Sequence, residues 1–145
     1  MQNKTEYAAE IFTEGFNCAQ SVLAPFCEGY SLDKEQALKL SSGLGGGCNL
    51  GELCGAVMCA AMVIGLKDGW TNAKDTAARS CNSAKLAQFI DEFKTAHGSV
   101  VCRDLLGYDI TTEEGMAKKQ AIDRAISPCN SFVRTAVEIL EKSGY

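Results

Sequence analysis

The segment from Leu53 to Leu66 contains no charged side chain and is apolar on almost every side of a helix. Such a helix needs neighbouring elements all around it, because no face of it favours water. The run is shorter than the roughly 20 residues that a helix needs to cross a bilayer. We therefore expect a buried central helix over residues 52–67, with other elements packed on every side of it.

Helical spacing dominates the rest of the chain. Apolar residues recur three and four positions apart, and the alternation typical of strands is nearly absent. The sequence predicts an all-α fold, a compact helical bundle that forms one domain over residues 1–145. Helices are expected over residues 4–14, 18–27, 33–41, 52–67, 73–97, 100–106, 113–125 and 128–142. Two apolar stripes are expected to face the core, namely Ala77, Cys81, Ala84, Ala87, Ile90 and Phe93 on the long helix, and Val133, Val137 and Leu140 on the last.

The composition excludes several classes of partner. A net charge of -4 and the lack of a basic stripe give no reason to expect nucleic acid or an anionic membrane. Charged residues interrupt the start of the chain, so we expect no signal peptide and a cytoplasmic location, where thiols stay reduced. The eight cysteines are therefore expected to be ligands, redox centres or small buried hydrophobes.

A glycine-rich segment between Gly43 and Gly51 precedes the apolar helix and puts Cys54 in its first turn. Glycines allow backbone amides to approach an anion closely, and a helix N-terminus stabilises negative charge. A phosphate-binding loop is the competing interpretation, but no Lys-Ser or Lys-Thr pair follows the glycines and no strand is expected before them. The pattern favours a thiolate at Cys54.

Two more cysteines follow clear helix-start signals. Asn17, with Gln20 three residues later, predicts a capping box that puts Cys18 at the first helical position. Ser127, followed by a proline, predicts a second start that puts Cys129 at the second position.

A fourth cysteine lies close to another expected helix start. Gly98 should end the long helix and Ser99 should begin the next, which places Cys102 near the third position. Unpaired amides and the helix dipole at these positions stabilise a thiolate, the form that attacks disulfides and binds soft metals. Four candidate site residues share this setting: Cys18, Cys54, Cys102 and Cys129.

Four segments of the chain carry a recognisable pattern. They are GFNCAQSVL from Gly15, GLGGGCNLGELCGAVMCAAMVIGLKDG from Gly43, HGSVVCRDLLG from His97 and SPCNSFVRTAVEIL from Ser127. Together they resemble the redox-active proteins named for their C_GCAxxG_C_C pattern, over nearly the whole chain.

This resemblance implies a small, mostly helical, redox-active protein, related to a domain of the split-Soret cytochromes that holds an iron-sulfur centre. It places the characteristic cysteines of the family at Cys18, Cys54, Cys102 and Cys129. Cys59 stands where the family motif has its last glycine, so it either changes helix packing or adds a thiol near the centre.

The other cysteines are interpreted from their surroundings. Cys48, in the glycine-rich segment, is either an exposed redox partner or an incidental thiol. Cys27, Cys59 and Cys81 lie at helix ends or in apolar stripes, where a cysteine serves as a small hydrophobe, and we expect them to be structural.

The spacing of the cysteines disfavours several familiar sites. No CxxC pair occurs, which argues against a zinc ribbon, a thioredoxin-type dithiol and a bacterial ferredoxin run. The lack of CxxCH argues against covalent c-type haem.

Three functions stay open for the four candidate cysteines. In the first, Cys18, Cys54, Cys102 and Cys129 converge to bind an iron-sulfur cluster of the 2Fe-2S type for electron transfer. In the second, the protein is a metal-free thiol-disulfide carrier or sensor, with Cys54 as the low-pKa thiolate and one of the other three as its resolving partner. In the third, the cysteines hold a structural zinc ion in a helical interaction module. The sequence identifies no redox partner protein, does not decide whether the protein is an enzyme, and leaves the oligomeric state open, a homo-oligomer included.

Overall fold

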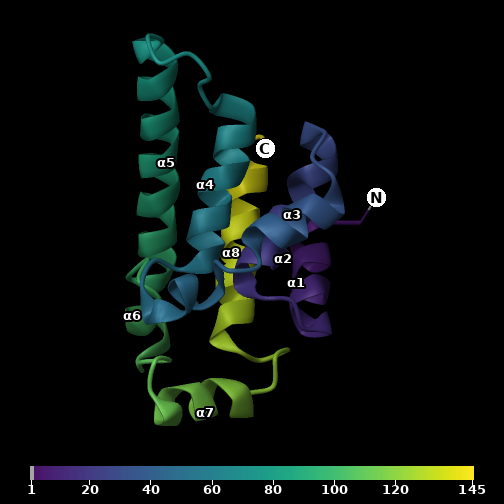
Figure 1. Ribbon diagram of the computed structural model, residues 1–145, viewed down its shortest axis with the longest axis vertical. Helices are drawn as coiled ribbons and strands as arrows, with labels where there is room; N and C mark the ends of the chain where they lie inside the picture. The colour runs from purple at the N-terminus through teal and green to yellow at the C-terminus, as the bar shows by residue number, and fades with distance from the viewer. Residues whose placement is uncertain (1) are drawn as a thin grey trace.

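The computed structural model describes residues 2–145, which form helices joined by turns and loops (Figure 1). Within these residues no strand is present, and one isolated antiparallel bridge joins Leu53 to Val101. The all-α prediction is confirmed. The elements are α1 (Lys4–Glu14), α2 (Cys18–Cys27), η1 (Glu28–Tyr30), α3 (Lys34–Ser41), η2 (Gly47–Gly51), α4 (Gly55–Asp68), α5 (Thr76–His97), α6 (Cys102–Leu106), α7 (Glu113–Ala121) and α8 (Pro128–Lys142).

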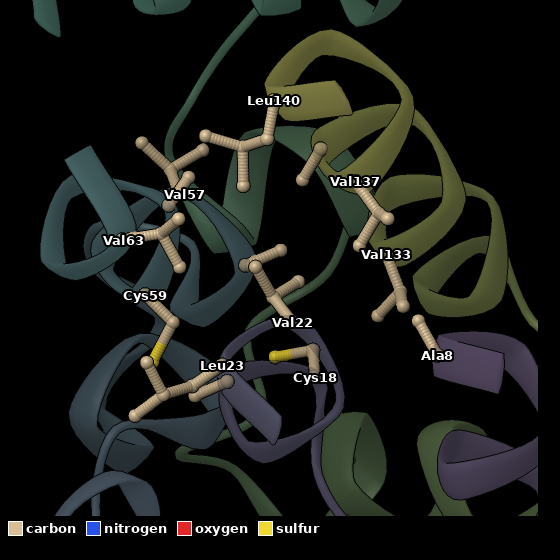
Figure 2. Packing of buried hydrophobic residues seen from close by; sticks show 14 of the residues in the cluster. Ala8, Cys18, Val22, Leu23, Val57, Cys59, Val63, Val133, Val137 and Leu140 are labelled. Carbon is tan, nitrogen blue, oxygen red and sulfur yellow. The ribbon is translucent and has the colours of Figure 1, made fainter. Parts of the chain in front are cut away.

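The core lies where α2, α4 and α8 meet, with α1 packed on α2 and α8 and with α5 packed on α4 and α8 (Figure 1). Side chains from the three central helices interleave there, as Figure 2 shows for Val22 and Leu23 of α2, Val57 and Val63 of α4, and Val133 of α8. Each of these side chains is fully buried, and burying one of this size stabilises the fold by about 1.5–3 kcal/mol.

Side-chain caps begin two of the four helices at whose starts the candidate cysteines lie, α2 and α8. Gln20 N–H donates to Asn17 Oδ1 over 2.9 Å, and Asn17 N–H donates to Gln20 Oε1 over 3.1 Å, so the predicted capping box of α2 is present. At the start of α8, Cys129 N–H donates to Ser127 Oγ over 3.2 Å. The long helix α5 ends at a left-handed Gly98, with φ of 85°. The predicted bounds of α2 and α8 and the predicted end of α5 at residue 97 are confirmed.

The apolar helix α4 begins at Gly55 and not at residue 52, so Cys54 is its N-cap and does not lie in its first turn. Cys54 N–H donates to the Val100 carbonyl over 2.8 Å, and Cys102 N–H donates to the Glu52 carbonyl over 2.6 Å. This pairing holds both segments in an extended conformation around the bridge. The helices expected at 52–67 and 100–106 therefore start later than predicted, and Cys102 occupies the first position of α6.

Two other helix ends differ from the prediction by three residues or more, whereas α3 begins and α4 ends one residue later than predicted. α5 begins at Thr76 and not at residue 73, because Asp75 caps it by accepting a 2.9 Å hydrogen bond from Ala78 N–H. α7 ends at Ala121 and not at residue 125, because Ile122 is extended, with φ of -84° and ψ of 131°.

The apolar stripe predicted on the long helix is wrong at four of its six positions. Phe89 and Phe93 are 3% and 0% exposed and set the face of α5 that meets the core. These rings bury more apolar area than the alanines do, so the helix is rotated to favour them. Four members of the predicted stripe are exposed: Ala77, Cys81, Ala84 and Ala87. The stripe predicted on α8 is confirmed, since Val133, Val137 and Leu140 are fully buried.

The central helix α4 is not enclosed on every side. It packs against α2, α5 and α8, but Met62 and Leu66 on its remaining face are each 39% exposed. The expectation of neighbours all around is wrong for this face, because α1 and α3 pack over α2 instead. No helix among residues 2–145 is both long and apolar enough to cross a membrane.

The glycine-rich segment contains a left-handed turn. Gly46, Gly47, Cys48 and Asn49 have φ values of 64°, 60°, 57° and 59°. An L-residue other than glycine loses roughly 1–2 kcal/mol in this conformation, so the two glycines reduce the cost of the turn and the surrounding contacts have to offset the rest.

We expect Phe93→Ala to lower the free energy of unfolding by about 3–5 kcal/mol, because the ring is fully buried and lies against Phe89 and Phe132. Urea denaturation measures the change. Ile126→Ala is the matched control, since Ile126 is 80% exposed and should change the free energy by no more than about 0.5 kcal/mol. Equal losses in the two variants would contradict the core described above.

Candidate functional site

One cavity of about 70 Å³ lies at the end of the bundle where α2, α4, α6 and α8 begin. Its wall contains the four cysteines that the sequence analysis selected: Cys18, Cys54, Cys102 and Cys129. The first three are 8%, 4% and 7% exposed, and Cys129 is half-buried. The aromatic rings of Phe12 and Phe132 also line the cavity. The fold thus brings together four thiols from distant parts of the chain in one largely apolar space.

The backbone pairing around the Leu53–Val101 bridge places Cys54 and Cys102 on the same wall. An ion pair covers this pairing on the outside, where Arg103 Nη1 and Nη2 donate to the Glu52 carboxylate over 2.7 and 3.0 Å. The pair is solvent-exposed, so we assign it no more than about 1 kcal/mol.

Gly55 allows α2 to approach the start of α4. A Cβ atom at this position would lie 2.9 Å from Cys18 Sγ, 2.7 Å from the Leu44 carbonyl oxygen and 3.1 Å from Ala19 Cβ. All three distances are shorter than ordinary contacts. The Leu44 carbonyl and the Ala19 methyl group cannot move aside without a shift of the backbone or of α2. A glycine at the first position of α4 is therefore what leaves room for Cys18 beside Cys54.

The glycine-rich segment closes over the start of α2. Asn17 Nδ2 donates to the Ser42 carbonyl over 2.9 Å, and a Cβ on Gly45 would lie 2.6 Å from the Asn17 side chain. This contact brings Gly46 to the cavity, where its N–H donates to the sulfur of Cys18.

Cys18 and Cys54 are joined by a hydrogen bond in which the Cys54 thiol donates to the Cys18 sulfur. This bond lowers the pKa of Cys18 to about 6, against an opposing effect of burial. The N–H groups of Gly46 and Ala19 and the charge of Lys119 also lower this pKa. The same hydrogen bond, together with burial, raises the pKa of Cys54 well above its ordinary value. The directions of these shifts make Cys18, and not Cys54 as the sequence analysis expects, the thiol of the pair that ionises first.

The other two cavity thiols stay protonated over a wider range of pH. Burial raises the pKa of Cys102 to about 11, and the negative charges of Cys129 and Cys18 add to the effect. Burial, followed by the charge of Cys18, also raises the pKa of Cys129. Cys18 is thus the thiol that ionises first, and its charge acts on the others.

Two cations that the sequence analysis did not select also line the cavity, namely Lys119 of α7 and Arg124. Arg124 lies over the Phe12 ring at 4.2 Å, donates from Nε to the Phe12 carbonyl over 2.7 Å, and donates from Nη2 to the Phe16 carbonyl. No local signal separates Lys119 from its neighbour Lys118, so only the fold could identify it.

The remaining cysteines lie elsewhere. Cys27 and Cys59 are fully buried, as expected of structural cysteines, and Cys59 lies among the apolar side chains of α2 and α4 (Figure 2). Burial raises the pKa of Cys59 to about 12, with a further contribution from the charge of Cys18. Cys81 is exposed, so its assignment to the core is wrong, and Cys48 is exposed on η2.

The four cavity thiols do not surround a single point. Within residues 2–145, no group of three or more His, Cys, Asp or Glu side chains meets around a position for one metal ion. The four thiols therefore lie at separate points of the cavity wall and not around one metal position.

A model of the family described as "Putative redox-active protein (C_GCAxxG_C_C)" matches residues 16–143. No curated protein and no solved structure matches the chain. The matched range contains all four cysteines of the cavity.

We expect Gly55→Ala to lower the free energy of unfolding by about 1–3 kcal/mol, because the added methyl group overlaps Cys18 Sγ and the Leu44 carbonyl. Gly65→Ala on the same helix is the control. Nothing lies within 4 Å of a Cβ at Gly65, so this change should stabilise α4 by up to about 1 kcal/mol. Chemical denaturation of both variants tests the contact, and a neutral or stabilising Gly55→Ala would refute it.

The reduced, metal-free protein should gain thiolate absorbance in the ultraviolet as the pH rises through about 6, where Cys18 loses its proton. Cys54→Ala removes the donor and should move this transition toward the ordinary thiol value of 9.0. Cys54→Ser keeps a donor and should leave the transition low, whereas Cys18→Ser should abolish it. A transition near pH 6 in Cys54→Ala would show that the hydrogen bond is not its cause.

Proposed function

The chain belongs to the C_GCAxxG_C_C family of redox-active proteins, and on this basis we propose that Cys18, Cys54, Cys102 and Cys129 form a redox centre that binds a 2Fe-2S cluster and transfers single electrons. The observation that supports this proposal is that four thiols, each at the start of a different helix, line one cavity. Four cysteine thiolates are the usual ligands of such a cluster.

The arrangement of the thiols suits a centre with two metal ions better than a centre with one. A 2Fe-2S cluster takes two thiolates on each iron, so it requires two pairs of cysteines and no group of three around one point. Cys18 and Cys54 share a hydrogen bond and supply one pair. Cys102 and Cys129, which line the same cavity, would supply the other.

When bound, a cluster of this type accepts and releases one electron at a time. The protein would supply the hydrogen bonds, the positive charge and the apolar wall around the cluster. The N–H groups of Gly46 and Ala19 donate to the Cys18 sulfur, and Lys119 and Arg124 bring positive charge to the cavity wall. These groups offset negative charge on the sulfurs, and the aromatic rings keep water away from them.

Burial also favours electron transfer over exchange with a protein disulfide. A disulfide on a partner protein has to reach the attacking sulfur along the S–S axis, but Cys18 and Cys54 are 8% and 4% exposed. A single electron can pass to a separate redox partner protein without contact between the reacting atoms.

A metal-free dithiol is the second candidate, and the hydrogen bond between Cys18 and Cys54 favours it. A small hydroperoxide could enter the cavity. The Cys18 thiolate would attack its outer oxygen, which breaks the O–O bond, gives a sulfenic acid at Cys18 and releases an alkoxide that takes up a proton. The Cys54 thiol would then attack the Cys18 sulfur, which forms a disulfide and releases water. In total the two thiols lose two electrons, and the hydroperoxide is reduced to an alcohol and water.

A structural zinc ion receives the least support of the three functions. Zinc takes four ligands in a tetrahedron around one point, and no three candidate side chains within residues 2–145 share such a point.

Iron and acid-labile sulfide, measured with an absorption spectrum on protein purified without oxygen, test the proposal. We expect two irons and two sulfides per chain, since that is the composition of the cluster. Changing any one of Cys18, Cys54, Cys102 or Cys129 to Ala should abolish or severely reduce cluster content. Cys48→Ala and Cys81→Ala are matched controls, because these cysteines are exposed and lie outside the cavity wall.

Other outcomes distinguish the alternatives. A protein without iron that forms a Cys18–Cys54 disulfide with a stoichiometric amount of hydroperoxide would favour the dithiol. A protein that holds one zinc ion and has no redox activity would overturn both redox proposals.

A further inference from the structure

We infer that Lys119 couples the charge of the cysteine centre to the position of α7, so that α7 closes over the cavity when the centre is reduced and opens when it is oxidised. The inference rests on the proposed redox role of the four cysteines. It applies to the cluster form of that role, in which each electron that the centre accepts adds one negative charge to the cavity.

Residues 110–124 form a strap that is anchored at each end. At the first end, Ile110 is 3% exposed, and its Cδ1 atom would lie 2.7 Å from a Cβ on Gly46, so it packs tightly against the glycine-rich segment. At the second end, Arg124 donates to the carbonyls of Phe12, in α1, and Phe16, which follows that helix. Both anchors lie next to the cavity.

Between its anchors few residues of the strap are buried, although Ile122 also lines the cavity and is half-buried. Gly115 is the only buried residue of α7. Figure 1 shows α7 lying across the end of the molecule, below the lower ends of α5 and α8. Local hydrogen bonds stabilise the start of α7. Thr112 Oγ1 accepts from Gly115 N–H over 3.0 Å, and just before the helix Asp109 Oδ1 accepts from the N–H and hydroxyl of Thr111. A helix that is stable locally but weakly packed can move as a unit at a small cost in free energy.

Lys119 is the charged residue of α7 that reaches the cavity. Its Nζ atom would lie 3.5 Å from a Cβ on Gly46, the residue whose N–H donates to the Cys18 sulfur. Within residues 2–145, no carboxylate forms an ion pair with Lys119. Its neighbour Lys118 points elsewhere, pairing with Glu114 at 3.7 Å and lying over the Tyr108 ring.

These contacts make the charge in the cavity the main electrostatic partner of Lys119. The attraction is stronger here than in water, because the lysine is half-buried at the wall of a largely apolar cavity. Each electron added to the centre strengthens this attraction and favours the closed position of α7. By linkage, the closed position favours reduction to the same extent.

Hydrogen exchange of the α7 amides in the reduced and the oxidised protein tests the inference. In the wild type, exchange across α7 should be about fivefold faster or more after oxidation, the lower end of usual coupling between two sites. Lys119→Gln should exchange at the fast rate in both states. Lys119→Arg keeps the charge and should behave like the wild type, as should Lys118→Gln, the matched loss of charge on the same helix.

Three observations keep the outcomes separate. Amides of α4 and α8 should exchange equally in all variants, which shows that the core is intact. Equal exchange of α7 in the two redox states, or a Lys119→Gln protein that responds like the wild type, would overturn the inference. A centre that undergoes neither oxidation nor reduction, as judged from its spectrum and thiol count, would instead refute the proposed function and the inference with it.

Discussion

The close approach of α2 and α4 at Gly55 is the contact on which the rest of the site depends. It allows the Cys18 sulfur to lie beside Cys54, and their shared hydrogen bond sets the first ionisation in the cavity. The same approach places the start of α2 under the glycine-rich segment, which adds the N–H of Gly46. The position of Cys18 beside Cys54 is therefore a consequence of one small residue at the first position of α4.

Local signals in the sequence were enough to place two of the cavity cysteines. Cys18 and Cys129 follow side-chain caps that act within a few residues, and the structure contains both caps. The start of α4 could not be predicted in the same way. Its position depends on pairing with the segment before α6, which is distant in sequence, and that pairing makes Cys54 an N-cap.

The spacing of residues in the sequence also does not predict the role of side chains that depends on tertiary packing. Cys81 was assigned to the core because small apolar residues recur near it, yet the larger rings of Phe89 and Phe93 decide which face of α5 is buried. Lys119 lies in a polar stretch with no distinguishing neighbour, and only the fold brings it to the thiols. The charge at Cys18 depends on donors from three separate elements, so the sequence pointed to Cys54 instead.

The left-handed turn from Gly46 to Asn49 has a consequence for the order in which the molecule acquires its chemistry. Local preference opposes this conformation at Cys48 and Asn49, so the turn is stable only while α2 and the segment around Ile110 support it. The Gly46 donor to Cys18 then appears only in the completed fold. A newly made chain would carry eight ordinary thiols, which gain their distinct reactivities as the last contacts close.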